Sequence, residues 1–129
     1  RTLTTLRNNK MSYVCVDEPQ GFKSSVPAVA EATSDIGVVR FHGRNREMWE
    51  KDSKSAADRF DYLYTPDELE EWAPKVRELA EGTDVTYVMF NNCKYDYAPR
   101  NARELAEILG PELVSPWEGA TAGQLGMEL

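Results

Sequence analysis

Three short apolar runs, each ending in a group of polar residues, constrain the fold of this chain more than any other feature. The runs cover residues 13–16, 36–41 and 85–90 and are rich in valine and aromatic residues. Runs of this length and composition are typical of parallel strands that are buried on both faces. The polar residues that follow are Asp17 and Glu18 after the first run, His42, Gly43, Arg44 and Asn45 after the second, and Asn91 and Asn92 after the third. The sequence therefore predicts an α/β fold whose polar groups gather at one edge of a parallel sheet.

A functional site is expected at that edge, because ligands of parallel α/β folds bind beyond the carboxyl ends of the strands. We predict that Asp17, Glu18 and His42 are catalytic and move protons or, through the carboxylates, hold a divalent metal. Arg44 can pair bidentately with a carboxylate or phosphate, and Arg100 opens a predicted helix whose amino-terminus favours an anion. The full set of residues predicted to bind substrate is Arg40, Gly43, Arg44, Tyr64, Asn91, Asn92, Arg100 and Asn101.

Several of these residues also have a structural interpretation, which the sequence leaves open. Asp17 can end its strand and pair with an arginine, since structural ion pairs are common at such positions. His42 is the only histidine in the chain, and it can instead be bonded to a neighbouring loop. Alternation within the second run places Val39 and Phe41 on one side and Arg40 and His42 on the other, which fits a polar barrel interior or mouth. The usual zinc-ligand spacings are missing, so the metal and any other cofactor stay unknown.

The clearest helix signal begins at Thr65, which caps a helix whose first position is proline and whose capping box is completed by Glu68. An apolar face with three- and four-residue spacing follows it, and Gly82 ends the helix. Pro74 lies inside and is expected to bend it, because proline lacks a backbone donor. Further helices are predicted within residues 1–10, 47–57 and 99–109.

Composition restricts the class of protein. The chain has 129 residues and a net charge of −7, enough for one domain and unfavourable for a surface that grips nucleic acid nonspecifically. No apolar run approaches the roughly 20 residues that cross a bilayer. Cys15 is expected to be a small core residue, and only Cys93 accompanies it, so a reducing, cytoplasmic location is predicted.

Six segments bear on family membership, namely VCVDEP from residue 14, VRFHGRN from residue 39, YLY from residue 62, ELEEW from residue 68, FNN from residue 90 and APRNA from residue 98. Together, in this order and spacing, they resemble the YecE-like family, domain of unknown function 72. The resemblance implies a partial TIM-barrel-like (β/α) fold with parallel strands, about half of a barrel that typically has about 250 residues. Residues 1–112 would be its carboxyl-terminal half and residues 113–129 a flexible tail. The rest of the barrel would then be a partner, and this chain alone would be inactive and prone to associate through its open sheet edges.

The resemblance implies no reaction, and two functions stay open. The first is a hydrolase or lyase that acts on a small phosphate- or carboxylate-bearing substrate, of which a phosphodiester is one version. The second is a noncatalytic binding module, or an accessory protein in nucleic-acid maintenance, whose extra support is a short match to clamp-binding peptides at residues 124–127. An unstructured end is the simpler explanation of so short a match.

Overall fold

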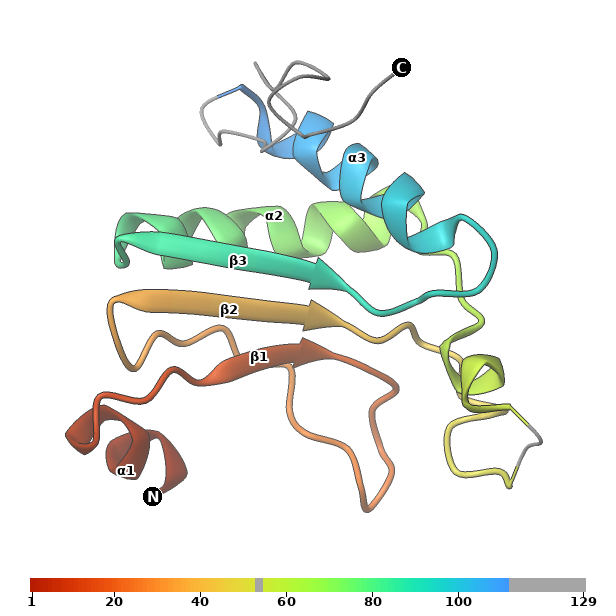
Figure 1. Ribbon diagram of the computed structural model, residues 1–129, viewed down its shortest axis with the longest axis horizontal. Helices are drawn as coiled ribbons and strands as arrows, with labels where there is room; N and C mark the ends of the chain where they lie inside the picture. Colours follow the sequence, from red (N-terminus) through yellow and green to blue (C-terminus); the bar gives the residue numbers. More distant parts are fainter. Residues whose placement is uncertain (53–54, 112–129) are drawn as a thin grey trace, which may run out of the picture.

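Three parallel strands and the helices beside them form the part of the chain that the computed structural model describes, residues 1–52 and 55–111. The strands β1 (Val14–Asp17), β2 (Ile36–Phe41) and β3 (Val85–Phe90) pair in the order β1-β2-β3. All three arrows point the same way in Figure 1, and the polar loops leave from their heads. The predicted α/β class and its parallel strands are therefore confirmed. Within the described residues, no helix is long and apolar enough to span a membrane.

The register divides the sheet into two faces with different surroundings. Phe41 lies level with Asp17 and Phe90, and Val39 lies level with Cys15 and Val88. These rows face the helices, and Cys15, Val39 and Phe41 are fully buried in the core, as predicted for Cys15. The packing is tight here, since the rings of Phe41 and Phe90 stack with centroids 4.6 Å apart.

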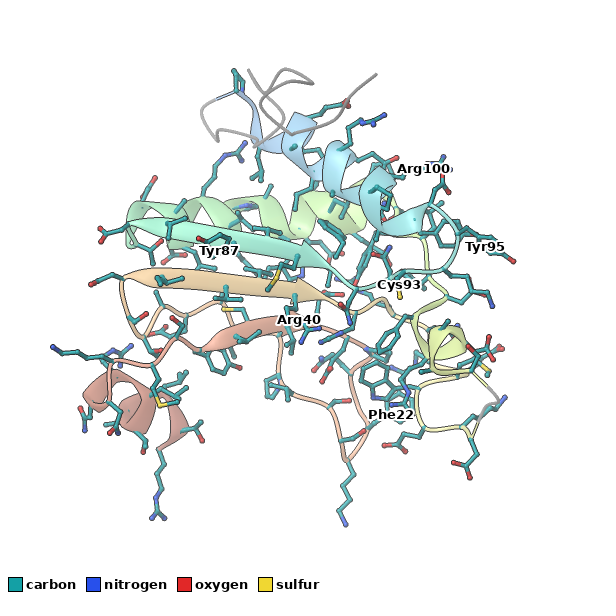
Figure 2. The ribbon with its side chains drawn as sticks, viewed as in Figure 1. Phe22, Arg40, Tyr87, Cys93, Tyr95 and Arg100 are labelled. Atoms are coloured by element: carbon teal, nitrogen blue, oxygen red, sulfur yellow. The ribbon has the colours of Figure 1, made fainter. Side chains whose placement is uncertain are left out.

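The opposite face of the sheet is largely uncovered. Alternation places Val14, Val38 and Tyr87 on it, then Val16, Arg40 and Met89 in the next row. Tyr87 and Met89 on β3 are 55% and 44% exposed, and Figure 2 shows Tyr87 and Arg40 on the strands. The guanidinium group of Arg40 therefore lies among apolar side chains on this face, which we call the open face.

Two helices cover the buried face. The helix α2 (Pro66–Glu81) begins with the predicted capping box, in which the Glu68 N–H donates to Thr65 Oγ1 (3.3 Å) and the Thr65 N–H donates to Glu68 Oε2 (2.9 Å). It continues through Pro74 to Glu81. The helix α3 (Tyr97–Leu109) begins two residues earlier than predicted and packs on α2 and β3. Figure 1 shows both helices on one side of the strands.

The connection between β2 and α2 differs from the prediction. The predicted helix over 47–57 is wrong, because residues 46–48 form a turn and the only helical segment is the 3-10 helix η1 (Ala56–Phe60) among the described residues of this connection. The side chain of Asn45 instead links two parts of this connection: Oδ1 accepts from the Met48 N–H (3.2 Å) and Nδ2 donates to the Asp61 carbonyl (3.0 Å). The helix predicted within 1–10 is present as α1 (Thr2–Asn8). The predicted tail, 113–129, lies outside the described residues.

Candidate functional site

The predicted site residues lie at the carboxyl end of the strands but on two different sides of the sheet. The sheet pairing continues beyond the strands, since the His42 N–H donates to the Asp17 carbonyl (2.9 Å) and the Asn91 N–H donates to the Phe41 carbonyl (2.7 Å). Alternation therefore directs His42 and Asn91 toward the open face, while Asp17 faces the helices. The polar groups therefore lie at the same end of the sheet, as expected, but they do not all lie on the same face of it.

Asp17 is the centre of a buried hydrogen-bond network on the helix side. Its residue is 2% exposed, and Trp72 Nε1 donates to Oδ2 across 2.7 Å. Tyr64 Oη donates to Oδ1 across 2.7 Å, and the Arg44 guanidinium donates to both oxygens, with Nη2 2.7 Å from Oδ2. Every donor is an N–H or O–H group, so the carboxylate lone pairs are occupied by protein. The structural interpretation, a strand end paired with an arginine, describes these contacts; the catalytic role of Asp17 stays a prediction.

Arg44 is surrounded by three carboxylates. Besides Asp17, its guanidinium contacts Glu71 (3.1 Å) and Glu68 (3.6 Å). The hydrogen bond to Asp17 raises the pKa of Arg44, against the opposing effect of burial. Its positive charge is thus balanced within the protein, which leaves less of it for an external anion.

Tyr64 links this network to the turn after β2. Its hydroxyl accepts a hydrogen bond from the Gly43 N–H (2.8 Å) while donating to Asp17. Burial and the neighbouring Asp17 carboxylate raise the pKa of Tyr64, so the hydroxyl keeps its proton and remains a donor. Asn101 of α3 holds the backbone of Tyr64 from the other side, accepting from its N–H (3.0 Å) and donating to its carbonyl (3.1 Å). Asn92 in turn donates to Asn101 Oδ1 (2.8 Å).

Gly43 is required by the shape of this turn. Its φ is +90°, and a Cβ at this position would lie 2.8 Å from Tyr62 Cβ. A side chain would therefore both strain the backbone and push the 62–64 segment away. The predicted substrate-binding roles of Gly43, Tyr64, Asn92 and Asn101 stay predictions, and their observed hydrogen bonds are with one another and with neighbouring protein groups such as Asp17.

On the open side, three polar side chains have no protein partner. Across the described ranges 1–52 and 55–111, neither the Arg40 guanidinium nor the Asn91 amide makes a hydrogen bond or ion pair. His42 Nδ1 is buried and has no partner there either. Its ring packs near Trp49 and Phe60, with centroids 6.4 Å and 5.8 Å away. These three residues retain the hydrogen-bonding capacity that a ligand needs.

The imidazole of His42 is held toward its neutral form. Burial lowers the pKa of His42, and the positive charge of Arg40 lowers it further, while Glu18 and Asp17 oppose this effect. A neutral imidazole has one nitrogen that donates and one that accepts, so it can take or give a proton. The Arg40 guanidinium, unpaired within the described residues, and the His42 imidazole, which can take or give a proton, therefore lie on the same face of the sheet.

The remaining two predicted residues, Glu18 and Arg100, make their own contacts outside this group. Glu18 is 8% exposed, and its Oε1 accepts from the Val26 N–H (2.6 Å), which ties down the loop that follows β1. Arg100 lies on the exposed surface of α3 (Figure 2), where it pairs with Glu104 at 3.8 Å. The structure therefore does not place Arg100 with Arg40, because α3 covers the opposite face of the sheet.

A cavity of about 330 Å³ lies between the loop after β1 and the segment after β2. It is lined by Asp17, Glu18, Arg44 and Arg46 among others, and not by Arg40, His42 or Asn91. We give it less weight than the open face, since Asp17 and Arg44 already satisfy each other there. In the described part of the chain, no three His, Cys, Asp or Glu side chains are grouped as metal ligands.

The family model described as "Protein of unknown function DUF72" matches residues 1–123. The chain belongs to the DUF72 family. This confirms the resemblance, since the YecE-like family and DUF72 are names for the same group.

Three relatives of this DUF72 chain are much longer than it. UPF0759 protein YunF of Bacillus subtilis (strain 168) is 34% identical over 116 residues, which are 87% of this chain and 41% of YunF. A DUF72 crystal structure from Thermotoga maritima is 37% identical with a TM-score of 0.76, covering 84% of this chain and 40% of that one. A second, from Enterococcus faecalis, is 29% identical with a TM-score of 0.78, covering 88% and 42%. The chain thus spans about two fifths of the length of these relatives.

Sequence reasoning missed the residues that complete the site of this DUF72 chain. Trp72 lies on the apolar face of the predicted helix, and it also donates to Asp17. The signal was available, because a buried indole N–H needs an acceptor. Trp49 and Phe60, which pack near His42, come from the connection whose structure was predicted wrongly.

Proposed function

We propose that this DUF72 chain carries part of an enzyme site in which Arg40 binds the phosphate or carboxylate group of a small substrate and His42 transfers a proton. Asn91 would orient the substrate through its amide. The single observation that supports this assignment is that these side chains keep unpaired hydrogen-bonding groups on one face within the described ranges, whereas Asn92 Oδ1, which also has no partner there, is buried beside Asn101. A hydrolase or lyase reaction uses both a group that binds an anion, here Arg40, and a group that transfers a proton, here His42.

The surroundings of Arg40 favour an anionic ligand. A guanidinium among apolar side chains is partly removed from water, and within the described residues no carboxylate pairs with it, so an incoming anion relieves a desolvation cost. Its planar fork of N–H donors matches two oxygens of a phosphate or carboxylate. Val16 and Met89, which lie level with Arg40 on the two neighbouring strands, supply apolar walls.

The surroundings of His42 favour proton transfer near neutral pH. Its lowered pKa keeps the imidazole unprotonated there, which is the form a general base requires. When an anion neutralises Arg40, one cause of the lowered pKa is removed, and the imidazole becomes a stronger base with substrate bound.

The fold that would complete the site is a TIM-barrel-like one. Support comes from three parallel strands with helices on one face only, and from exposed apolar residues on the other face. In such a barrel the open face would line the interior, and the carboxyl ends of the strands would carry the site. The remaining strands would come from sequence beyond the two fifths that this chain shares with its relatives.

Calorimetric titration with inorganic phosphate tests the anion site. Arg40→Gln is expected to weaken binding by about tenfold or more, as loss of a charge-assisted hydrogen bond does. Arg103→Gln removes the same charge from an exposed position on α3 and should bind phosphate as the unsubstituted chain does. Equal affinities of the two variants would refute the assignment of Arg40.

A release assay with p-nitrophenyl phosphate, bis(p-nitrophenyl) phosphate and p-nitrophenyl acetate, run on a full-length barrel that contains this chain, tests the chemistry. His42→Gln should lower turnover by about 10²–10⁴-fold while phosphate binding persists. Phosphate binding without turnover of any substrate would instead favour the noncatalytic binding module. The peptide match at residues 124–127, on which the accessory role in nucleic-acid maintenance depends, lies outside the described residues.

A further inference from the structure

The two peptide N–H groups on either side of the His42 Cα each donate to one of two linked residues, Asp17 and Tyr64. The N–H of His42 donates to the Asp17 carbonyl across 2.9 Å. The N–H of Gly43 donates to Tyr64 Oη across 2.8 Å, and that hydroxyl donates to Asp17 Oδ1 across 2.7 Å. Residue 42 is therefore fixed at both peptide groups, at one by the sheet pairing with β1 and at the other by a phenol from the helix side of the sheet.

Asp17 and Tyr64 are themselves rigidly held. Asp17 is fixed by Trp72 of α2 and by Arg44. The Tyr64 backbone is fixed by Asn101 of α3, and its ring packs edge-on against Phe41 with centroids 5.3 Å apart. Contacts from α2 and α3 therefore fix Asp17 and Tyr64, and through these two residues they fix the turn that carries the imidazole.

We propose that Tyr64 and Asp17 are positioning residues for His42, which set the direction of its imidazole from behind the sheet without touching the substrate. This inference rests on the proposed function of His42. It gives a role to Tyr64 and Asp17, whose side chains already form hydrogen bonds within the protein. Proton transfer depends strongly on such positioning, because an error of about 1 Å costs orders of magnitude in rate. Gly43 completes the device, since its φ of +90° brings its N–H to the phenol.

The test uses the fact that His42 is the only histidine in the chain, so its imidazole C–H signals in a proton NMR spectrum are unambiguous. Tyr64→Phe removes the hydroxyl and keeps the ring. The matched control is Tyr62→Phe, which removes a neighbouring phenol whose hydroxyl donates to Glu68 instead. In Tyr64→Phe the imidazole signals are expected to shift and the pKa of His42 to move up toward about 6.5, because the freed turn lets water reach the ring. The charged groups acting on the ring, Arg40, Glu18 and Asp17, are the same in both variants.

Unchanged His42 signals in Tyr64→Phe, or the same change in Tyr62→Phe, would overturn the proposal even if phosphate binding and turnover are intact. Amide hydrogen exchange in the unsubstituted chain gives a second test that does not depend on any variant folding. The N–H of Gly43 should exchange much more slowly than that of Asn45, for which the structure gives no backbone hydrogen bond. Equal exchange rates at the two amides would also overturn it.

Discussion

Trp72 Nε1 of α2 lies 2.7 Å from Asp17 Oδ2 at the end of β1, so the helix and the edge strand share a buried hydrogen bond. The two residues are far apart in the sequence and meet in a position where neither is open to solvent. Their contact fixes the depth at which α2 lies on the sheet.

Asp17→Asn should be the most destabilising conservative change in this network. An amide would turn an N–H toward the donors of Trp72, Tyr64 or Arg44, which leaves buried groups unpaired, and loss of one partner of a buried ion pair costs about 3–5 kcal/mol. Urea unfolding measures the free energy of unfolding. Asp84→Asn, an exposed aspartate just before β3, is the control and should change it by about 0.5 kcal/mol or less. Similar values for both variants would contradict the network.

Gly43→Ala is expected to destabilise the fold by about 1–3 kcal/mol, because a non-glycine residue is strained at positive φ and its Cβ would meet Tyr62 at 2.8 Å. Gly82→Ala is the matched control, because it adds the same methyl group at another glycine. Gly82 has a φ of −93°, and its added Cβ would make only ordinary contacts, the nearest at 3.6 Å. Thermal unfolding should rank Gly43→Ala well below Gly82→Ala, and the reverse order would show that the turn tolerates a side chain.

Stability should fall in mild acid partly because of His42. Its pKa is lowered in the folded chain, so as the pH falls below about 6.5 the unfolded chain takes up a proton that the folded chain does not. The free energy of unfolding therefore declines between about pH 6.5 and the lower folded pKa. His42→Gln should lose less stability than the unsubstituted chain over this window, as measured by urea unfolding at several pH values. Parallel pH profiles of the two proteins would contradict the lowered pKa.

The elements of the fold were predictable where the local pattern decides the structure. The apolar runs gave β2 and β3 their observed bounds, and the capping box at Thr65 gave the start of α2. Residues 47–57 were not predictable in this way, because the long-range bonds of the Asn45 side chain decide the path of that connection.

The site was predictable as a set of residues at one end of the sheet, but not in its division between the two faces. One residue of difference separates Asn91, on the open side, from Asn92, which bonds to Asn101 beneath α3. The sequence places both after the same strand, and only the register and the packing of α3 distinguish them. Likewise, nothing in the pattern around Arg40 and Arg44 indicates that three carboxylates surround Arg44 while, among the described residues, none pairs with Arg40.

The most direct test of the account follows the single imidazole of His42 by NMR while inorganic phosphate is added to the whole chain. The account predicts that the His42 signals shift in a saturable way, and that Arg40→Gln abolishes this shift whereas Arg103→Gln preserves it. Signals that do not respond to phosphate, or that respond equally in Arg40→Gln, would contradict the claim that the open face of the sheet holds the site.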